Sequence, residues 1–264
     1  MTNKIPQLTA VTRERYAGKK WRRSSGYGFA ATNALVPIVG AELARAALAL
    51  PLAFLQEAGR FVLVAVLSLT PGRNMLVGPD GRWLGRYIPA CFRSYPFRLF
   101  PIKETGRPVL CIEADGGAAE AETTGEDFFD QEGNLSPILK KTFEFLSEYE
   151  RNRQATELAV STLAEARLIQ PWPIKIKAEK SEREIAGLHC IDEAALKALP
   201  DDAFLKLRKN SALPIVYAQL LSAAHIGIFE QLARNELRPK PAAALPESLD
   251  GLFGISSGDI IKFQ

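Results

Sequence analysis

The chain has 264 residues, of which 47% are hydrophobic and 24% are charged, and its formal net charge at pH 7 is +3. This composition is typical of a soluble protein with a large apolar core, and it argues against a disordered chain or a small disulfide-rich scaffold. The charge is uneven, because residues 1–33 carry seven Lys and Arg side chains against one Glu. Such a basic arm suggests an anionic partner.

The basic arm also contains Trp21, Tyr27 and Phe29. Basic residues interleaved with aromatic residues occur in proteins that bind single-stranded nucleic acid through phosphate contacts and base stacking. The alternative is an arm that pairs as an edge strand and turns its aromatic side chains inward. We favour the ordered edge strand and expect no nucleic-acid binding, because no RNA- or DNA-binding motif accompanies the charge.

The stretch Ala34–Leu55 follows the basic arm but is not predicted to span a membrane. Pro37, Glu42, Arg45 and Pro51 interrupt it, whereas a span needs about 20 mostly apolar residues without a central charge. We therefore expect no membrane span and a cytoplasmic location.

The centre of the fold is predicted in the same apolar region. Val39–Leu50 is rich in Ala and has no internal Pro, which predicts a helix. Leu52–Gln56 and Arg60–Leu69 are predicted as two strands joined by a short turn, and the second is apolar on both faces, as a central strand would be. Pro- and Gly-containing turns then separate two further short strands, Met75–Val77 and Arg82–Gly85.

Phe97–Ile102 and Pro108–Ala114 are predicted as a strand pair that closes this sheet. Asp115–Gly133 is acidic and Gly-rich, so we expect an exposed loop anchored by two phenylalanines. Ser136–Leu168 has apolar residues three or four positions apart, which predicts an amphipathic helix about 45 Å long.

The C-terminal part alternates between strand and helix signals. Pro173–Ala178 alternates Ile with Lys and is predicted to form a hairpin with Glu184–Ile191. Two aspartates then cap short helices, and Ser211–Leu232 predicts a final helix. Residues 236–264 begin with three prolines among alanines, which is linker composition, and the sequence leaves open whether the last apolar stretch docks on the fold.

Together these elements predict an α+β protein. A mainly antiparallel sheet with one early helix is followed by a helical part with an inserted hairpin. The predicted parts are an N-terminal α/β sheet part at residues 1–114, a loop at 115–135, a helical part with a hairpin at 136–235, and a Pro- and Ala-rich tail at 236–264.

Candidate chemistry is sparse. Cys91, Cys111 and Cys190 are too widely spaced for a disulfide scaffold or a zinc site, so we expect buried, reduced thiols. His189 and His225 have apolar neighbours and no nucleophile motif around them, which favours structural histidines with satisfied hydrogen bonds. We expect no metal and no cofactor, and the sequence identifies no catalytic residue.

The least ordinary composition is a compact group of Trp, Tyr, Arg, Gly and Pro residues between positions 73 and 97. Trp, Tyr and Arg often anchor recognition, because they combine large area with planar hydrogen bonding. The alternative is that Trp83 and Tyr87 fill the interface between sheet and helix while the arginines extend into solvent. Both interpretations remain open. The candidate binding residues are Arg73, Asn74, Arg82, Trp83, Arg86, Tyr87, Arg93 and Tyr95.

A series of segments carries a resemblance to a known family. The segments are Leu35–Val39, Pro51–Leu55, Asn74–Pro89, Arg93–Phe97, Val109–Glu113, Phe128–Asp130, Phe145–Tyr149, Gly187–Glu193 and Leu199–Asp202. In their order and spacing the chain resembles the bacterial SapC family over about residues 8–232, and Gly81–Pro89 is the most specific part. The resemblance implies a link to bacterial surface-layer protein and supplies no catalytic residue. One departure is Tyr16, where members often have a histidine, so any chemistry that needs this histidine is absent here.

We therefore expect a non-enzymatic binding or accessory protein, related to the handling of bacterial surface or exported proteins, with a protein or peptide partner. The alternative is an enzyme, or the partner of an enzyme, that acts on a small or peptidyl substrate in a pocket near Trp83. A buried pocket with perturbed titratable groups favours the enzyme, whereas a shallow exposed aromatic patch favours the binder. The sequence leaves the oligomeric state open.

Overall fold

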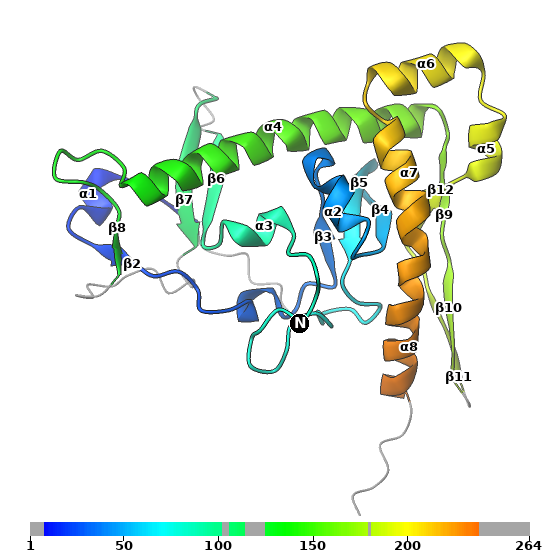
Figure 1. Cartoon of the computed structure of the whole chain (residues 1–264), viewed down its shortest axis with the longest axis horizontal. Helices are drawn as coiled ribbons and strands as arrows, with labels where there is room; N and C mark the ends of the chain where they lie inside the picture. The colour runs from blue at the N-terminus through cyan, green and yellow to red at the C-terminus, as the bar shows by residue number, and fades with distance from the viewer. Residues whose placement is uncertain (1–7, 102–105, 114–124, 179–180, 238–264) are drawn as a thin grey trace, which may run out of the picture.

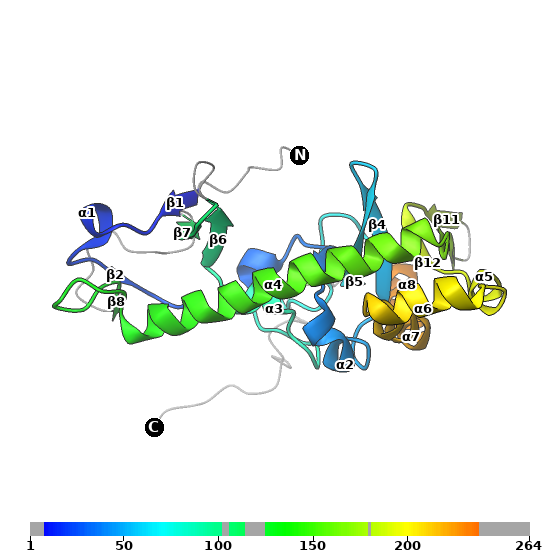
Figure 2. The same cartoon turned by 90° about the horizontal axis from the view of Figure 1, so that it is seen from above.

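The computed structural model describes residues 8–101, 106–113, 125–178 and 181–237 (Figure 1). A long helix, α4 (Pro137–Glu165), crosses the molecule, and one sheet lies toward each of its ends (Figures 1 and 2). The predicted α+β class is confirmed, because helices accompany sheets whose strand pairings in the described residues are antiparallel.

The larger sheet has five strands in the order β3-β5-β4-β12-β9. β4 and β5 form the predicted hairpin, and Ala58 and Gly59 at its tip have φ values of 47° and 79°. Residues 63–66 of β5 are all buried, as expected of an interior strand. The strands are β3 (Leu35–Pro37), β4 (Leu52–Glu57), β5 (Arg60–Val66), β9 (Ile169–Pro171) and β12 (Leu188–Ile191).

The C-terminal strands correct one predicted pairing. The segment Glu184–Ile191 does not pair as one strand with Pro173–Ala178. Instead, β10 (Ile174–Ala178) pairs with β11 (Ser181–Ile185), whereas β12 pairs with β4 and β9 in the larger sheet. Gly187 lies between β11 and β12 with a φ of 94°, a conformation that favours glycine and interrupts the strand.

The smaller sheet has three strands in the order β1-β7-β6. The prediction that Phe97–Ile102 and Pro108–Ala114 close the main sheet is therefore wrong. They pair with each other, and the second partner of β7 is β1 from the N-terminal arm. Ile102 and Ala114 themselves lie outside the described residues. The strands are β1 (Leu8–Ala10), β6 (Phe97–Pro101) and β7 (Pro108–Glu113).

The N-terminal arm is ordered against this sheet from residue 8 onward, which confirms the edge-strand interpretation of its structure. After β1 and the short helix α1 (Arg13–Tyr16), β2 (Lys20–Trp21) pairs with β8 (Glu126–Asp127). The Trp21 side chain is only 2% exposed and meets Phe97 edge to face, with ring centroids 4.7 Å apart. The aromatic residue thus faces the core while the basic residues around it face solvent.

Helix α4 is the predicted long amphipathic helix, and its 29 residues correspond to a length of about 44 Å. The Ser136 hydroxyl caps it by accepting a hydrogen bond from the Leu139 N–H. Its first half buries Leu139 and Leu146 in the core of the smaller sheet. Its second half buries Val160 and Leu163 in the core of the larger sheet. One helix therefore holds both sheets.

The predicted early helix is shorter than Val39–Leu50. A 3-10 turn, η2 (Gly40–Glu42), leads into α2 (Leu43–Ala46), and helical hydrogen bonds extend only to the Leu50 N–H. Pro51 limits the helix, because the residue before a proline disfavours the α conformation.

The predicted short strands Met75–Val77 and Arg82–Gly85 are also corrected, since they meet only at one bridge, between Val77 and Trp83. Two backbone hydrogen bonds flank this bridge, from the Gly78 N–H to the Arg82 carbonyl and from the Leu84 N–H to the Leu76 carbonyl, each at 2.8 Å. Two more short elements of this region are η1 (Gly28–Ala30) and α3 (Ala90–Arg93).

The C-terminal helices cover the larger sheet. Ser222 Oγ accepts a hydrogen bond from the Leu52 N–H, and Gln219 Oε1 accepts one from the Ile191 N–H, each at 3.0 Å, so polar side chains tie α7 to two strands.

Leu213–Leu232 has a mean hydropathy of 1.3, and 39% of its most apolar window is buried. Its length and composition would also suit a membrane-spanning helix. Residues 238–264 of the predicted tail lie outside the described residues. The elements are α5 (Glu193–Lys197), α6 (Asp201–Lys209), α7 (Leu213–Ser222), η3 (Ala223–His225) and α8 (Ile226–Leu237).

The burial of Trp21 leads to a stability prediction for the N-terminal arm. Trp21→Ala should lower the free energy of unfolding by about 3–5 kcal/mol, because it removes a fully packed aromatic side chain. Leu84→Ala is the control, since Leu84 is 60% exposed and its loss should cost no more than about 0.5 kcal/mol. Urea unfolding measures both variants. Equal stabilities would show that the arm does not contribute to the core.

Candidate functional site

Glu42 is a buried carboxylate that joins its own segment to residues 87–93. Its Oε1 accepts hydrogen bonds from the Tyr87 hydroxyl at 2.7 Å and the Ala90 N–H at 2.6 Å, and its Oε2 accepts one from the Val39 N–H at 3.1 Å. Arg93 Nη2 lies 4.0 Å from Oε1. A buried charge is tolerated when it is hydrogen-bonded and paired in this way. Glu42 therefore holds α3 in place beside η2.

Trp83 and Tyr87 pack against this centre. Burial raises the pKa of Tyr87, and its hydrogen bond to Glu42 raises the pKa further, so its hydroxyl remains a donor at neutral pH. Trp83 Nε1 donates to the Tyr87 carbonyl at 3.0 Å. The rings of Tyr27 and Phe92 pack on Trp83 at centroid distances of 5.6 and 5.9 Å. Trp83 and Tyr87 thus have structural contacts on several sides.

The other predicted binding residues differ in their exposure. Asn74 is buried, where its Nδ2 donates to the Ala30 carbonyl and its Oδ1 accepts from the Leu76 N–H. The Tyr95 ring stacks on Phe29 with centroids 3.7 Å apart. The side chains of Arg73, Arg82 and Arg86 are exposed, and so is that of Arg93. Asn74 is therefore not part of an exposed surface, and the role of the predicted residues in recognition stays a prediction.

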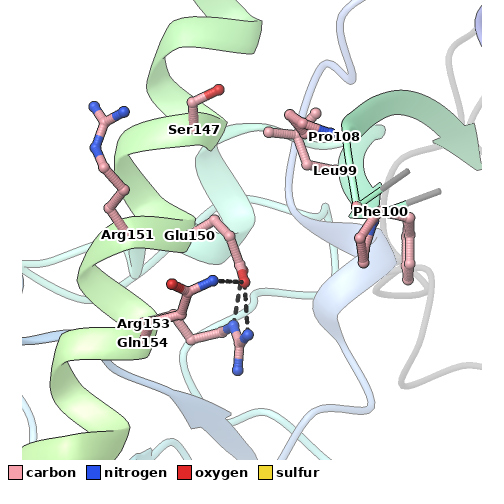
Figure 3. A pocket seen from close by; sticks show the side chains of 10 residues that line it. Leu99, Phe100, Pro108, Ser147, Glu150, Arg151, Arg153 and Gln154 are labelled. Atoms are coloured by element: carbon pink, nitrogen blue, oxygen red, sulfur yellow. Dashed lines mark hydrogen bonds and ion pairs between the residues drawn. The ribbon is translucent and has the colours of Figure 1, made fainter. Parts of the chain in front are cut away.

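A groove of about 570 Å³ lies between β6 and α4, and we call it the outer groove (Figure 3). Its β6 wall is apolar and includes Phe100, which is 43% exposed. Its α4 wall is polar, because Glu150 accepts hydrogen bonds from Arg153 Nε at 2.7 Å and from Gln154 Nε2 at 3.2 Å. The outer groove thus offers an apolar side and a polar side to one ligand.

A second cavity, of about 320 Å³, continues from the outer groove, with which it shares Leu99, Phe100, Glu150 and Arg153. We call it the inner pocket. Strand β3 of the larger sheet forms its far wall, and α3, which lies beneath α4 between the two sheets, contributes Cys91 (Figure 1). The inner pocket is therefore enclosed by elements from both sheets and by both helices.

The inner pocket contains two groups with perturbed pKa values. Burial raises the pKa of the Cys91 thiol to about 12, and the charge of Glu42 acts in the same direction. Burial, with smaller contributions from Cys91 and Glu42, also raises the pKa of Tyr149. Both groups are protonated at neutral pH, and a protonated thiol is a poor nucleophile. These shifts reflect burial and do not activate either group.

Strand β6 borders the cavities with an open edge. The Glu113 N–H donates to the Pro96 carbonyl at 3.0 Å, and hydrogen-bonded pairs alternate along an antiparallel ladder. The N–H and C=O of Leu99 therefore point away from β7, and no described strand pairs with that edge. Pro101 also lies on this edge but has no N–H to offer.

Strand β3 has the same arrangement on the opposite side. The Leu67 N–H donates to the Ala34 carbonyl at 2.8 Å, so alternation directs the backbone groups of Leu35 away from β5. β3 is the last described strand on this side of the larger sheet, and Leu35 lines the inner pocket. Two open strand edges thus border a single pocket.

The described residues contain no group of three or more His, Cys, Asp and Glu side chains that could hold a metal ion. His189 packs edge to face on Phe61 at 5.0 Å. The prediction of satisfied histidines is wrong in one respect, because Nδ1 of His189 and of His225 is buried without a hydrogen-bond partner in the described part of the chain. Neither histidine lines the outer groove or the inner pocket.

Sequence reasoning did not identify the residues of these cavities. An open edge depends on how distant strands pair, so nothing local marks Leu99 or Leu35. One local pattern does mark the polar wall of the outer groove: on α4, Glu150 and Glu157 stand three residues before and four residues after Arg153, which is the spacing of helical ion pairs.

Comparison with known proteins gives one match. A family model described as SapC matches residues 11–228, which is most of the chain. No curated protein and no solved structure matches it.

The raised pKa of Cys91 leads to a reactivity prediction. In a Cys111→Ser/Cys190→Ser variant, the remaining thiol should react with DTNB at pH 8 at least ~100-fold more slowly than free cysteine, because only the thiolate attacks. In urea the rate should return to that of free cysteine. A fast reaction in the folded protein would contradict the raised pKa of this half-buried thiol.

The raised pKa of Cys91 also makes the free energy of unfolding depend on pH. The folded pKa, about 12, is above the unfolded value, which is about 8.5. The thiol's contribution to stability is therefore complete below about pH 8.5 and is lost as the pH rises toward the folded pKa. Urea unfolding of the single-cysteine variant between pH 8 and 11 should show a decline that Cys91→Ala reduces.

Proposed function

The chain belongs to the SapC family, and from this premise we propose that it is a non-enzymatic binding protein that holds an extended segment of a bacterial surface or exported protein. The outer groove is the proposed binding site. The observation that carries the proposal is the open edge of β6 beside this groove.

An open strand edge supports peptide binding, because its unpaired N–H and C=O groups can pair with another extended chain. On β6 the backbone groups of Leu99 are in this position. Side chains of the bound segment would then alternate between the apolar wall at Phe100 and the polar wall at Glu150 and Gln154. The volumes of about 570 and 320 Å³ are in the usual range of ligand sites, about 300–1,000 Å³.

The alternative, an enzyme with a pocket near Trp83, has less support. Trp83 does not line the outer groove or the inner pocket. The titratable groups that do line them are held in unreactive states, since Cys91 and Tyr149 are protonated and Glu150 is bound to Arg153. A general base works best when its pKa lies near the operating pH, and the hydrogen bond from Arg153 lowers the pKa of Glu150 below its usual value.

A peptide-binding experiment tests the proposal. A displayed library of random dodecapeptides is selected on the immobilised full chain, and the selected peptides are then measured on Leu99→Pro, which removes the N–H at the open edge. Affinity should fall about ten-fold or more, because a lost backbone hydrogen bond and the added ring together cost at least ~1.4 kcal/mol.

Ile169→Pro is the matched control. It makes the same change on β9, the strand at the far edge of the larger sheet, and Ile169 does not line either cavity. It should leave the affinity unchanged. Thermal unfolding checks that both variants fold. Equal binding by Leu99→Pro and the original chain, or failure to select any peptide, would refute the proposed site.

A further inference from the structure

We propose that the inner pocket binds the free C-terminal carboxylate of the peptide that occupies the outer groove. This inference rests on the proposed function, and it names the part of the bound peptide that the inner pocket recognises. A chain that follows β6 through the outer groove enters the inner pocket and there meets β3, which forms the far wall at Leu35, Val36 and Pro37. The geometry therefore favours a ligand that ends in the pocket.

The lining of the inner pocket is rich in hydrogen-bond donors. Arg98 lines it, and the ion pair of Arg98 with Glu113 uses only Nε in the described structure, so the terminal nitrogens can donate to a second carboxylate. The Tyr149 hydroxyl also lines the pocket and has no hydrogen-bond partner among the described residues. Ser94 adds another hydroxyl. Carboxylate oxygens are the acceptors that such a set fits best.

Arginines and carboxylates both surround the pocket. Near Cys91, the charges of Arg98 and Arg93 favour an anion and the charge of Glu42 opposes it. Near Tyr149, Arg153 and Arg98 favour an anion against the same carboxylate. The Glu150 carboxylate on the wall is bound to Arg153. Each of these arginines already has a carboxylate partner, since Arg98 pairs with Glu113, Arg93 lies 4.0 Å from Glu42 and Arg153 is bound to Glu150. The pocket therefore recognises a carboxylate through its hydrogen-bond donors and not through an excess of positive charge.

The strand edges explain why a charged anchor is needed. On β6 only Leu99 has both its N–H and its C=O free to pair outward, because the Phe97 N–H donates to the Ser94 carbonyl and Pro101 has no N–H. On β3, Leu35 has both groups directed outward, whereas Pro37 again lacks the N–H. Backbone pairing at either edge is therefore short. A short pairing gains little affinity by itself, since each hydrogen bond contributes only about 0.5–1.5 kcal/mol. A carboxylate held by an arginine supplies the missing affinity and fixes the direction of the peptide.

Two peptide pools test the inference on the full-length chain. Random octapeptides are tethered by their N-termini, one pool with a free C-terminal carboxylate and the other with a C-terminal amide, and binding of the labelled chain is measured. We expect the acid pool to bind at least ten-fold more tightly. Equal binding of both pools would overturn the carboxylate site while leaving the groove intact. Binding to neither pool would overturn the proposed function and this inference with it.

Two variants separate the pocket from the groove. Arg98→Gln removes a charge and Tyr149→Phe removes a hydroxyl, and each should reduce the preference for the acid pool at least five-fold while binding of the amide pool is kept. Retained amide binding shows that the variants fold. Arg208→Gln is the control, because this exposed arginine on α6 lines neither the outer groove nor the inner pocket, and it should keep the full preference. An unchanged preference in Arg98→Gln would contradict the site.

Discussion

The packing of α4 across two separate sheets is the constraint on which the rest of the structure depends. Leu139 and Leu146 pack into the core of the smaller sheet, and Val160 and Leu163 pack into that of the larger one. Because a rigid helix sets the distance between the sheets, β3 and β6 face a common space without pairing with each other. The hydrophobic cores thus produce a cavity with two open strand edges, and the exposed side of α4 supplies its polar wall.

Helix α3 fills part of this space, and a buried carboxylate determines its position. Glu42 accepts hydrogen bonds from the Ala90 N–H and the Tyr87 hydroxyl, with Arg93 nearby. The same contacts place Cys91 at the wall of the inner pocket. The charge of Glu42 opposes an anion in the pocket, whereas the surrounding arginines favour one. Arg98 also pairs with Glu113 and Arg153 with Glu150, so the charges nearly balance and the hydrogen-bond donors of the pocket determine what it recognises.

Local signals made part of the fold predictable. The apolar spacing of α4 and the turn between β4 and β5 depend on neighbouring residues, and both elements were predicted correctly. The split into two sheets was not, because β7 takes its second partner from β1, about 100 positions earlier. Glu42 was not recognised either, since its partner Ala90 lies 48 positions further along the chain. The cavity arises from such distant pairings, so no motif could mark Leu99 or Tyr149 in advance.

A crystal structure of the chain bound to the tightest peptide of the free-carboxylate pool tests the central claim most directly. We predict a peptide main chain within hydrogen-bonding distance of the backbone of Leu99, with its terminal carboxylate against Arg98 and the hydroxyl of Tyr149. A peptide bound instead to the exposed surface around Arg82 and Arg86, or to the apolar side of α7 and α8, would contradict it.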